Sequence, residues 1–377
     1  MNILIAPGAF KHSLSANQAA DSIARGLKQA LPDANLTVLP IADGGNGTLD
    51  AWLAQGGTRH TITVHDPLMR PITADYGILP DGKTAVIEMA LASGLELLID
   101  NEVNPMKATT YGTGELLQQA RENGARRFII GMGGSATVDG ASGALRALGI
   151  KLLDASGAEI SHGGGGLSHI ATIDTSSLDL RWQDCEIIIA SDVENPLLGD
   201  KGAAAIFAPQ KGATKSQIPI LENNLRHFAE IIAQQQGRDI TGVVGGGAAG
   251  GLSAGLMAFL GGRIESGIDL LLKHNHFVER LKNTDYVITG EGQMDEQTIS
   301  GKGPIGVARL AKEHGVPTIA LVGGLNVHDT ILHENGIQAA FSIVDKPMPL
   351  DVALANAADL LERAALRIGY ILNMTTS

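Results

Sequence analysis

The stretch FIIGMGGSATVDGASGALRAL, residues 128–148, decides the fold class. An apolar run (128–130) leads into a glycine-rich loop (131–140), and a helix-patterned stretch (141–148) follows. This order directs unpaired backbone N–H groups and a helix N-terminus at one spot, which is how many folds hold phosphate. We therefore predict a phosphate-binding unit of strand, loop and helix here.

Short apolar runs recur along the chain, and helix-patterned segments lie between many of them. This alternation predicts parallel α/β architecture. A local signal supports the first helix, because Ser15 precedes the pattern as a candidate N-cap and Pro32 follows it as a stop. The apolar runs are 3–6, 36–40, 128–130, 187–190, 286–289, 318–322 and 341–344, and the helix-patterned segments include 16–30, 114–123, 217–234 and 351–368.

Residues 60–90 break the alternation. They carry alternating apolar and polar residues punctuated by Asp66-Pro67 and Pro80-Asp81-Gly82, which is typical of antiparallel strands and tight turns. We predict two α/β domains. Residues 1–60 and 283–377 form a doubly wound domain with a parallel, flavodoxin- or Rossmann-like sheet, and 61–282 form a mixed α/β domain inserted into it.

Composition excludes several classes of function. The chain has 377 residues, long enough for two cores, since single cores stop growing near roughly 250–300 residues. A net charge of -12 without a Lys/Arg block argues against nucleic acid or an anionic membrane as partner, and favours a small molecule. We expect neither a signal peptide nor a membrane span. Cys185 is the only cysteine, which excludes an intrachain disulfide, so the cytoplasm is the expected compartment.

Three predicted strands end in loops of small residues and carboxylates. These loops read IADGGNGT (41–48), ASDVENPLLG (190–199) and TGEGQMDEQT (289–298). Ligands of open α/β sheets bind outside the carboxyl ends of the strands, so the loops together predict one polar site, although each alone could be an ordinary turn. Carboxylates and phosphates repel each other at close range, so such a site needs a cation, and Mg²⁺ suits its oxygen ligands.

Two further stretches are candidates for binding phosphate. The loop GGGAAGGLSAG (245–255) contains Gly247 and Gly250 and lets a ligand approach the backbone, although tight helix packing or a hinge would use the same residues. Lys11 follows the first strand and can bind a phosphate as a point charge. For Lys211, in the motif FAPQKGA, an ordinary solvated surface position is the favoured reading.

The glycine loop also satisfies a rival pattern. Gly131, Gly133 and Ala136 give G-x-G-x-x-A after a strand, and Asp154 ends the next apolar run, where a dinucleotide fold places its ribose-binding acid. On spacing alone, an NAD(P)-dependent oxidoreductase is therefore an alternative. The acidic loops would have no evident role in hydride transfer.

Nine motifs follow one another along nearly the whole chain: IAPGAFKHSLSA, PIADGGNGT, IEMALASGLELL, TTYGTGELL, IIGMGGSATVDGASG, SDVENPLLG, FAPQKGA, GGGAAGG and ITGEGQMDEQTISGKGPIGVA. Together they resemble the bacterial type I glycerate kinase family. The resemblance implies phosphorylation of D-glycerate by ATP to 2-phosphoglycerate, two α/β domains and an active site in the interdomain cleft. It leaves the oligomeric state open between monomer and homodimer.

Phosphoryl-transfer chemistry assigns roles to the loop residues within that family, because the protein mainly positions oxygens in line and neutralises charge. We predict Asp192 as the base for the glycerate hydroxyl and Lys11 as a catalytic cation. The other predicted site residues are Gly133, Gly134, Ser135, Gly247 and Gly250 for nucleotide phosphates, and Ser13, Asp43 and Asn195 for substrate. Glu291 and Asp295, with Asp43 as a further candidate, are predicted to hold Mg²⁺ directly or through water.

A non-catalytic reading also remains. A two-domain α/β chain with a polar cleft could be a regulator that binds a small acid and turns nothing over. Transport-associated binding proteins usually need export, and we expect no signal peptide here. Turnover therefore distinguishes the enzyme from the regulator.

Overall fold

A computed structural model describes residues 1–295 and 303–375. Its contacts divide the chain into two compact units, each described here by itself. The first unit holds Met1–Asp43, Asp50–Gln55 and Ile268–Ser377, and the second holds Gly44–Leu49 and Gly56–Gly267. In the described part of the chain, no helix is both long and apolar enough to cross a membrane.

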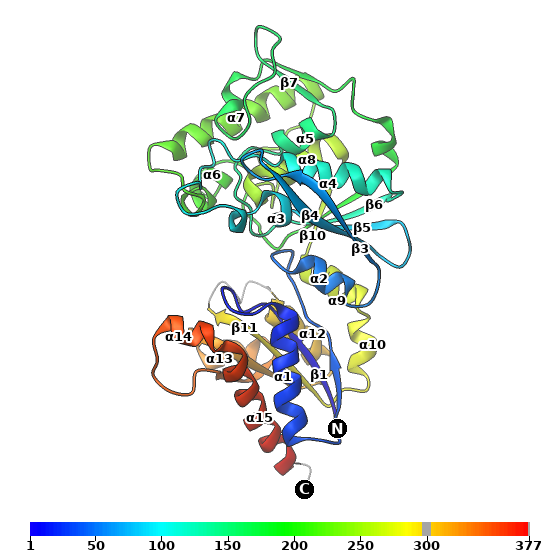
Figure 1. The fold of residues 1–377 in the computed structure, drawn as a ribbon, viewed down its shortest axis with the longest axis vertical. Coiled ribbons are helices and arrows are strands. Elements are labelled where there is room, and N and C mark those ends of the chain that lie inside the picture. The colour runs from blue at the N-terminus through cyan, green and yellow to red at the C-terminus, as the bar shows by residue number, and fades with distance from the viewer. Residues whose placement is uncertain (296–302, 376–377) are drawn as a thin grey trace. The chain divides into compact units, whose positions relative to one another are not determined.

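The first unit is built on a five-stranded sheet in which every neighbouring pair is parallel, in the order β13-β12-β11-β1-β2 (Figure 1). Its elements are β1 (Asn2–Pro7), α1 (Ala16–Ala30), β2 (Asn35–Val38), α2 (Thr48–Leu53, whose first two residues lie in the second unit), α9 (Gly267–His274), α10 (Phe277–Leu281), β11 (Tyr286–Met294), α12 (Gly303–Glu313), β12 (Thr318–Leu325), α13 (Asp329–Glu334), β13 (Ile337–Ser342), α14 (Leu350–Ala355) and α15 (Ala357–Thr375).

Helices cover both faces of this sheet. Leu321 of β12 is buried in the cluster that holds α1 and α15, whereas its neighbours Ala320 and Val322 are buried in the cluster that holds α12. Successive strand residues point to opposite faces, so the two sets of helices lie on opposite sides. The doubly wound parallel domain predicted from the alternating pattern is confirmed.

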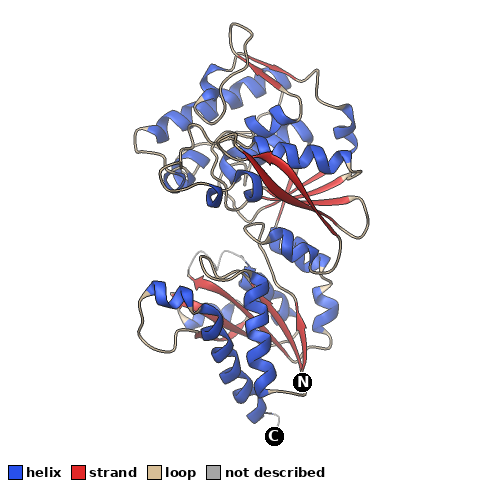
Figure 2. Ribbon diagram, in the orientation of Figure 1, coloured by secondary structure: helices blue, strands red, loops and turns tan. Residues whose placement is uncertain are grey.

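The second unit is built on a six-stranded mixed sheet in the order β10-β9-β6-β5-β4-β3. Figure 2 draws the strands of both units in red and the helices in blue. The pairs from β10 to β5 are parallel, whereas β3, β4 and β5 pair antiparallel, as residues 60–90 predict. Its elements are β3 (Thr58–His65), β4 (Pro71–Ile78), β5 (Thr84–Glu88), α3 (Ala90–Ser93), η1 (Leu95–Leu97), α4 (Tyr111–Glu122), β6 (Arg127–Gly131), α5 (Ser142–Ala147), β7 (Lys151–Leu153), η2 (Gly166–His169), β8 (Thr172–Asp174), η3 (Leu180–Asp184), β9 (Glu186–Ala190), α6 (Ala203–Phe207), η4 (Pro209–Lys211), α7 (Gln217–Gln236), α8 (Ala248–Leu260) and β10 (Arg263–Glu265).

The divisions between the units differ in position from the predicted domain boundaries at 60/61 and 282/283. Residues 268–282 lie with the first unit, because α9 and α10 contact α2 and the residues after it. The ring of His274 lies 4.6 Å from that of Trp52, and Arg280 Nη2 donates to Gln55 Oε1 at 2.8 Å. The short segment Gly44–Leu49 lies with the second unit. The predicted boundaries themselves stay a prediction.

Candidate functional site

The sheet of the first unit has a topological switch point between β1 and β11. The chain leaves β1 toward β2 on one side and leaves β11 toward β12 on the other. The crevice outside the carboxyl ends of two such strands is where open α/β sheets bind ligands. The turn after β1 and the end of β11 are therefore the first place to look for functional side chains.

Lys11 and Glu291 both lie at this switch point. Pro7, the last residue of β1, pairs with Gly290, so Glu291 is one residue beyond the end of β1. Gly8 N–H donates to Gly290 O at 2.8 Å, and a Cβ added to Gly292 would lie 3.1 Å from Lys11 N. The backbone that carries Lys11 therefore packs directly on the strand that carries Glu291, and the side chain of Lys11 is exposed.

Ser13 and Asp43 belong to segments at the same end of β1. Ser13 Oγ donates to Phe10 O at 2.9 Å and so closes the turn that carries Lys11. Asp43 follows Ile41, whose N–H donates to Pro7 O at 3.0 Å. The structure thus explains Ser13 as a turn residue with acceptor capacity remaining, while its predicted role in substrate binding stays a prediction.

Glu291 and Asp295 do not fit a shared magnesium site. Strand β11 extends to Met294, and at about 3.3 Å per residue the two Cα atoms lie about 13 Å apart, too far for both carboxylates to ligate one ion directly. In residues 1–295 and 303–375, no group of three or more His, Cys, Asp or Glu side chains could hold a metal. Mg²⁺ is commonly held by one or two carboxylates together with waters and substrate phosphates, so one of these side chains could suffice. The predicted roles of Glu291 and Asp295 in binding Mg²⁺ stay predictions.

In the second unit, three of the predicted loops meet at the carboxyl edge of the sheet. Gly133 N–H donates to Gly44 O at 2.8 Å, and a Cβ on Gly44 would overlap the carbonyl oxygen of Ala190. The neighbouring strands β6 and β9 end in register, at Gly131 and Ala190. Asp192 is two residues beyond that end, so it lies at the same edge as the glycine loop.

Glu88, the last residue of β5, holds the segment Gly44–Leu49 in place. Its side chain is buried, and its two carboxylate oxygens accept from Gly47 N–H at 3.0 Å and from Leu49 N–H at 2.9 Å. The sequence analysis missed this residue. Its position at the end of a strand, in the quoted motif IEMALASGLELL, was the available signal.

We expect Glu88→Gln to lower the free energy of unfolding by about 1–2 kcal/mol, because a carboxylate accepts both N–H groups while an amide offers one oxygen and a mismatched NH₂. Urea denaturation at pH 7 measures the change. The matched control is Glu96→Gln. The exposed Glu96 carboxylate accepts a hydrogen bond from Asn46 Nδ2, and its substitution should lower the free energy of unfolding by less than about 0.5 kcal/mol. Equal effects of the two substitutions would contradict the assignment.

The N-terminus of α5, the helix that follows the glycine loop, does not offer free N–H groups to a ligand as predicted. Gly133 N–H is already used by Gly44 O, and the N-terminus of α5 is occupied by the side chain of Asp139. Asp139 Oδ2 accepts from Gly143 N–H at 3.1 Å and from Thr110 N–H at 2.9 Å. Thr110 Oγ1 accepts from Ala144 N–H at 2.9 Å. The expectation that this helix N-terminus faces a phosphate is therefore wrong, because a carboxylate of the protein itself satisfies it.

Asp139 is fully buried, and burial raises the pKa of its carboxyl while the hydrogen bonds from Thr110 and Gly143 act in the opposite direction. What remains of the loop for a ligand is its outer part, Gly134 and Ser135. Gly134 has a φ of +77°, a conformation that favours glycine. The role of Gly133, Gly134 and Ser135 in phosphate binding stays a prediction.

Lys211 lies in the interior, whereas its sequence favours a position at the surface. It is 2% exposed instead of lying at the solvated surface, and its Nζ donates to Ser135 Oγ and to Thr137 O, each at 2.7 Å. Burial lowers the pKa of this ammonium to about 7, and the carboxylate of Asp139 opposes that decrease. A buried cation thus contacts the glycine loop directly.

The loop 245–251 contacts both the glycine loop (131–140) and the loop 190–199. Gly140 N–H donates to Gly250 O at 3.0 Å, and Gly247 N–H donates to Asn195 O at 2.9 Å. Cβ atoms on Gly247 and Gly250 would overlap the carbonyl oxygens of Pro196 and Thr137. The Asn195 side chain donates through Nδ2 to Lys201 O at 2.8 Å. Packing therefore accounts for these two glycines and for one side of the amide, and their predicted ligand contacts stay predictions.

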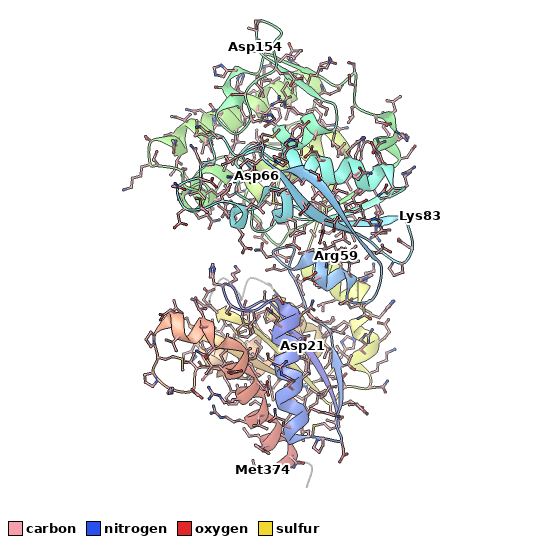
Figure 3. The ribbon with its side chains drawn as sticks, in the orientation of Figure 1. Asp21, Arg59, Asp66, Lys83, Asp154 and Met374 are labelled. Atoms are coloured by element: carbon pink, nitrogen blue, oxygen red, sulfur yellow. The ribbon has the colours of Figure 1, made fainter. Side chains whose placement is uncertain are left out.

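Asp154 does not follow a strand of the main sheet, which is the position that the ribose-binding acid of a dinucleotide site requires. Strands β7 and β8 form a separate antiparallel pair, so β7 is not the second parallel strand that a Rossmann unit needs. Asp154 Oδ1 accepts from Ser156 N–H at 2.8 Å and from the Ser156 hydroxyl at 2.6 Å, within its own turn. Asp154 is labelled in Figure 3. The geometry that the oxidoreductase alternative requires is absent from this part of the described chain.

We expect Asp154→Ala to leave nucleotide binding within about twofold and the free energy of unfolding within about 1 kcal/mol, since only an exposed turn loses its hydrogen bonds. Isothermal titration with ATP and with NAD⁺, alongside urea denaturation, checks both values. Binding of NAD⁺ by the wild type that disappears in Asp154→Ala would restore the dinucleotide reading.

Comparisons with known proteins agree over almost the full length of the chain. Residues 3–373 match the model of the glycerate kinase family. A protein named glycerate 2-kinase from Escherichia coli is 48% identical over 374 residues, covering 99% of this chain and 98% of the relative. One named glycerate kinase from Halalkalibacterium halodurans is 46% identical over 370 residues, covering 98% and 97%. A crystal structure titled putative glycerate kinase 2 from Salmonella typhimurium LT2 superposes with a TM-score of 0.86 at 43% identity, covering 100% of this chain and 99% of that one.

Proposed function

This chain belongs to the glycerate kinase family and is thus a phosphotransferase, and on that premise we propose that it transfers the γ-phosphoryl group of ATP to D-glycerate and releases 2-phosphoglycerate. The observation that carries the proposal is the match to relatives named glycerate kinase and glycerate 2-kinase across both units. The 2-hydroxyl follows from the name of the Escherichia coli relative.

The carboxyl edge of the second unit would supply the base and part of the phosphate site. Asp192 follows β9, and as a carboxylate it can accept the proton of the glycerate hydroxyl as that oxygen attacks phosphorus. Gly134 and Ser135 lie on the outer part of the neighbouring loop and offer N–H and O–H donors to phosphate oxygens. These roles require that the groups be positioned before reaction, which the packing of the three loops provides.

The switch point of the first unit would supply charge neutralisation. Lys11 offers a mobile ammonium to an anionic group, and Glu291 beside it would hold Mg²⁺ directly or through water. A Mg²⁺ ion held by Glu291 would neutralise part of the negative charge of the ATP phosphates during transfer. Asp43, near the same end of β1, stays our candidate for contact with the substrate.

The test is ADP release from Mg-ATP with D-glycerate, with L-glycerate and glycerol as controls and a parallel series in EDTA. Phosphorus NMR of the product distinguishes the 2-phosphate from the 3-phosphate. D-glycerate-dependent release that EDTA abolishes supports the proposal. ADP release that does not depend on glycerate would contradict the proposal, because the phosphoryl group would then be transferred to water. No release at all from folded protein would also contradict it, and would favour the non-catalytic reading.

A further inference from the structure

The buried Lys211 of the second unit donates its hydrogen bonds to the glycine loop. Lys211 is the last residue of η4, and both acceptors of its Nζ, Ser135 Oγ and Thr137 O, lie between β6 and α5. Burying an ammonium is costly, so a lysine at a merely structural position would be replaced by an apolar residue with little loss. The hydrogen bond from Lys211 Nζ to Ser135 Oγ indicates that the lysine has a role in orienting the hydroxyl group of Ser135.

An ammonium group can only donate hydrogen bonds, whereas a serine hydroxyl both accepts and donates. When Lys211 Nζ donates to Ser135 Oγ, the hydroxyl hydrogen of Ser135 must be given to another acceptor. Among the residues that the structure describes, none accepts from Ser135 Oγ. Ser135 retains 7% of its surface exposed, so its hydroxyl can reach a ligand at the loop.

A further negative charge near Lys211 would stabilise its buried ammonium. Among the described residues, Asp139 is the charged group whose field acts on the Lys211 ammonium, and its carboxylate is already held by Thr110 and Gly143. Burial keeps the pKa of Lys211 at about 7, so the ammonium and the neutral amine are close in free energy near neutral pH. A second negative charge next to Ser135 would favour the ammonium.

We propose that Lys211 is a positioning residue that, by donating to Ser135 Oγ, commits the hydroxyl hydrogen of Ser135 to an oxyanion bound at the glycine loop. This inference rests on the proposed kinase function, which supplies two such oxyanions, the phosphates of the nucleotide and the carboxylate of glycerate. Without the ammonium, Ser135 can turn its hydrogen toward other acceptors and the oxyanion loses its donor. Lys211 itself does not touch the ligand.

The test is a double-mutant cycle read by binding. We would measure the dissociation constants of Mg-free ATP and of D-glycerate by isothermal titration for the wild type, Lys211→Met, Ser135→Ala and the double variant. We expect each single substitution to weaken one of the two ligands by about tenfold or more, and the double variant to bind that ligand about as the weaker single variant does. The ligand that weakens identifies the oxyanion as phosphate or carboxylate. Lys215→Met, which removes an exposed lysine four residues away, should bind both ligands normally.

A second measurement, of proton uptake on ligand binding, begins with the wild type. In the wild type at pH 8, binding of the oxyanion should be accompanied by uptake of a fraction of a proton, seen as a binding enthalpy that depends on the ionisation enthalpy of the buffer. Lys211→Met should abolish this dependence. If Lys211→Met does not fold, as circular dichroism would show, the wild-type uptake and the effect of Ser135→Ala still decide the matter.

Three outcomes would overturn the inference: Lys211→Met binding both ligands within twofold of the wild type, effects of the two substitutions that multiply, or wild-type binding without proton uptake. None of these three outcomes contradicts the proposed function if the wild type still releases ADP with D-glycerate. A non-additive cycle in a protein that binds ATP without turnover would instead reject the kinase proposal and keep the role of Lys211.

Discussion

Replacing Asp192 by asparagine is expected to lower kcat for glycerate phosphorylation by about 10² or more, while the KM for ATP changes little. Asparagine keeps the size of the side chain and its position two residues beyond β9, but the amide cannot accept the hydroxyl proton. The loss therefore falls on the chemical step instead of on nucleotide binding. Steady-state kinetics with D-glycerate varied at saturating Mg-ATP measures it.

The matched control for Asp192 is Asp200→Asn, since Asp200 is an exposed carboxylate that directly follows the loop 190–199. It should retain wild-type kcat. Both variants should unfold at the same urea concentration as the wild type within experimental error. A near-normal kcat for folded Asp192→Asn would remove Asp192 from the role of base and would direct attention to the other carboxylates of the site.

The regular part of the fold was predictable because its signals are local. Helix α1 begins where Ser15 predicts, since Ser15 Oγ accepts from Gln18 N–H at 3.2 Å and Gln18 Oε1 accepts from Ser15 N–H at 2.9 Å. The apolar runs became β1, β6, β9, β11 and β12 because buried parallel strands need continuous apolar sequence. In β3 and β4, by contrast, apolar and polar residues alternate along the chain. This local pattern predicts the antiparallel pairing that these two strands have.

The site was less predictable because its key contacts join residues far apart in the sequence. The carboxylate that occupies the start of α5 is positioned by Thr110, 29 residues away, and the ammonium at Ser135 comes from 76 residues away. A glycine loop before a helix has the same sequence pattern whether the helix terminus faces a ligand or a buried aspartate. One signal for Lys211 was present: it is the single charged residue in 202–214, an unusual position for a surface lysine.

The predicted magnesium pair shows how the conformation of a segment decides a site. Glu291 and Asp295 are four residues apart, a spacing that brings side chains together on a helix and separates them on a strand. The sequence analysis treated residues 289–298 as a loop. Because β11 continues to Met294 beside β12, the two carboxylates are separated along an extended chain.

Gly250→Ala is expected to lower the free energy of unfolding by about 3 kcal/mol or more, which would make the second unit the first to unfold. The backbone of Gly250 has a φ of +67°, where an alanine costs about 1–2 kcal/mol. The added Cβ would also overlap Thr137 O and lie 2.6 Å from Val138 Cα, so the glycine loop and the loop 245–251 must separate. Urea denaturation followed by tryptophan fluorescence and circular dichroism measures the loss.

Gly82→Ala separates the two causes, because Gly82 has the same φ of +67° but no heavy atom within 4 Å of its added Cβ. It should cost only the conformational part, about 1–2 kcal/mol. Equal losses in the two variants would mean that the loops do not depend on close packing at Gly250. A Gly250→Ala protein of normal stability that fails to bind ATP would instead assign this glycine to the ligand, as the sequence alone had suggested. The larger loss expected at Gly250 follows from the overlap of the added Cβ with the carbonyl oxygen of Thr137. That oxygen also accepts a hydrogen bond from Lys211 Nζ, which donates to Ser135 Oγ as well. Gly250→Ala should therefore also disturb the contact between Lys211 and Ser135.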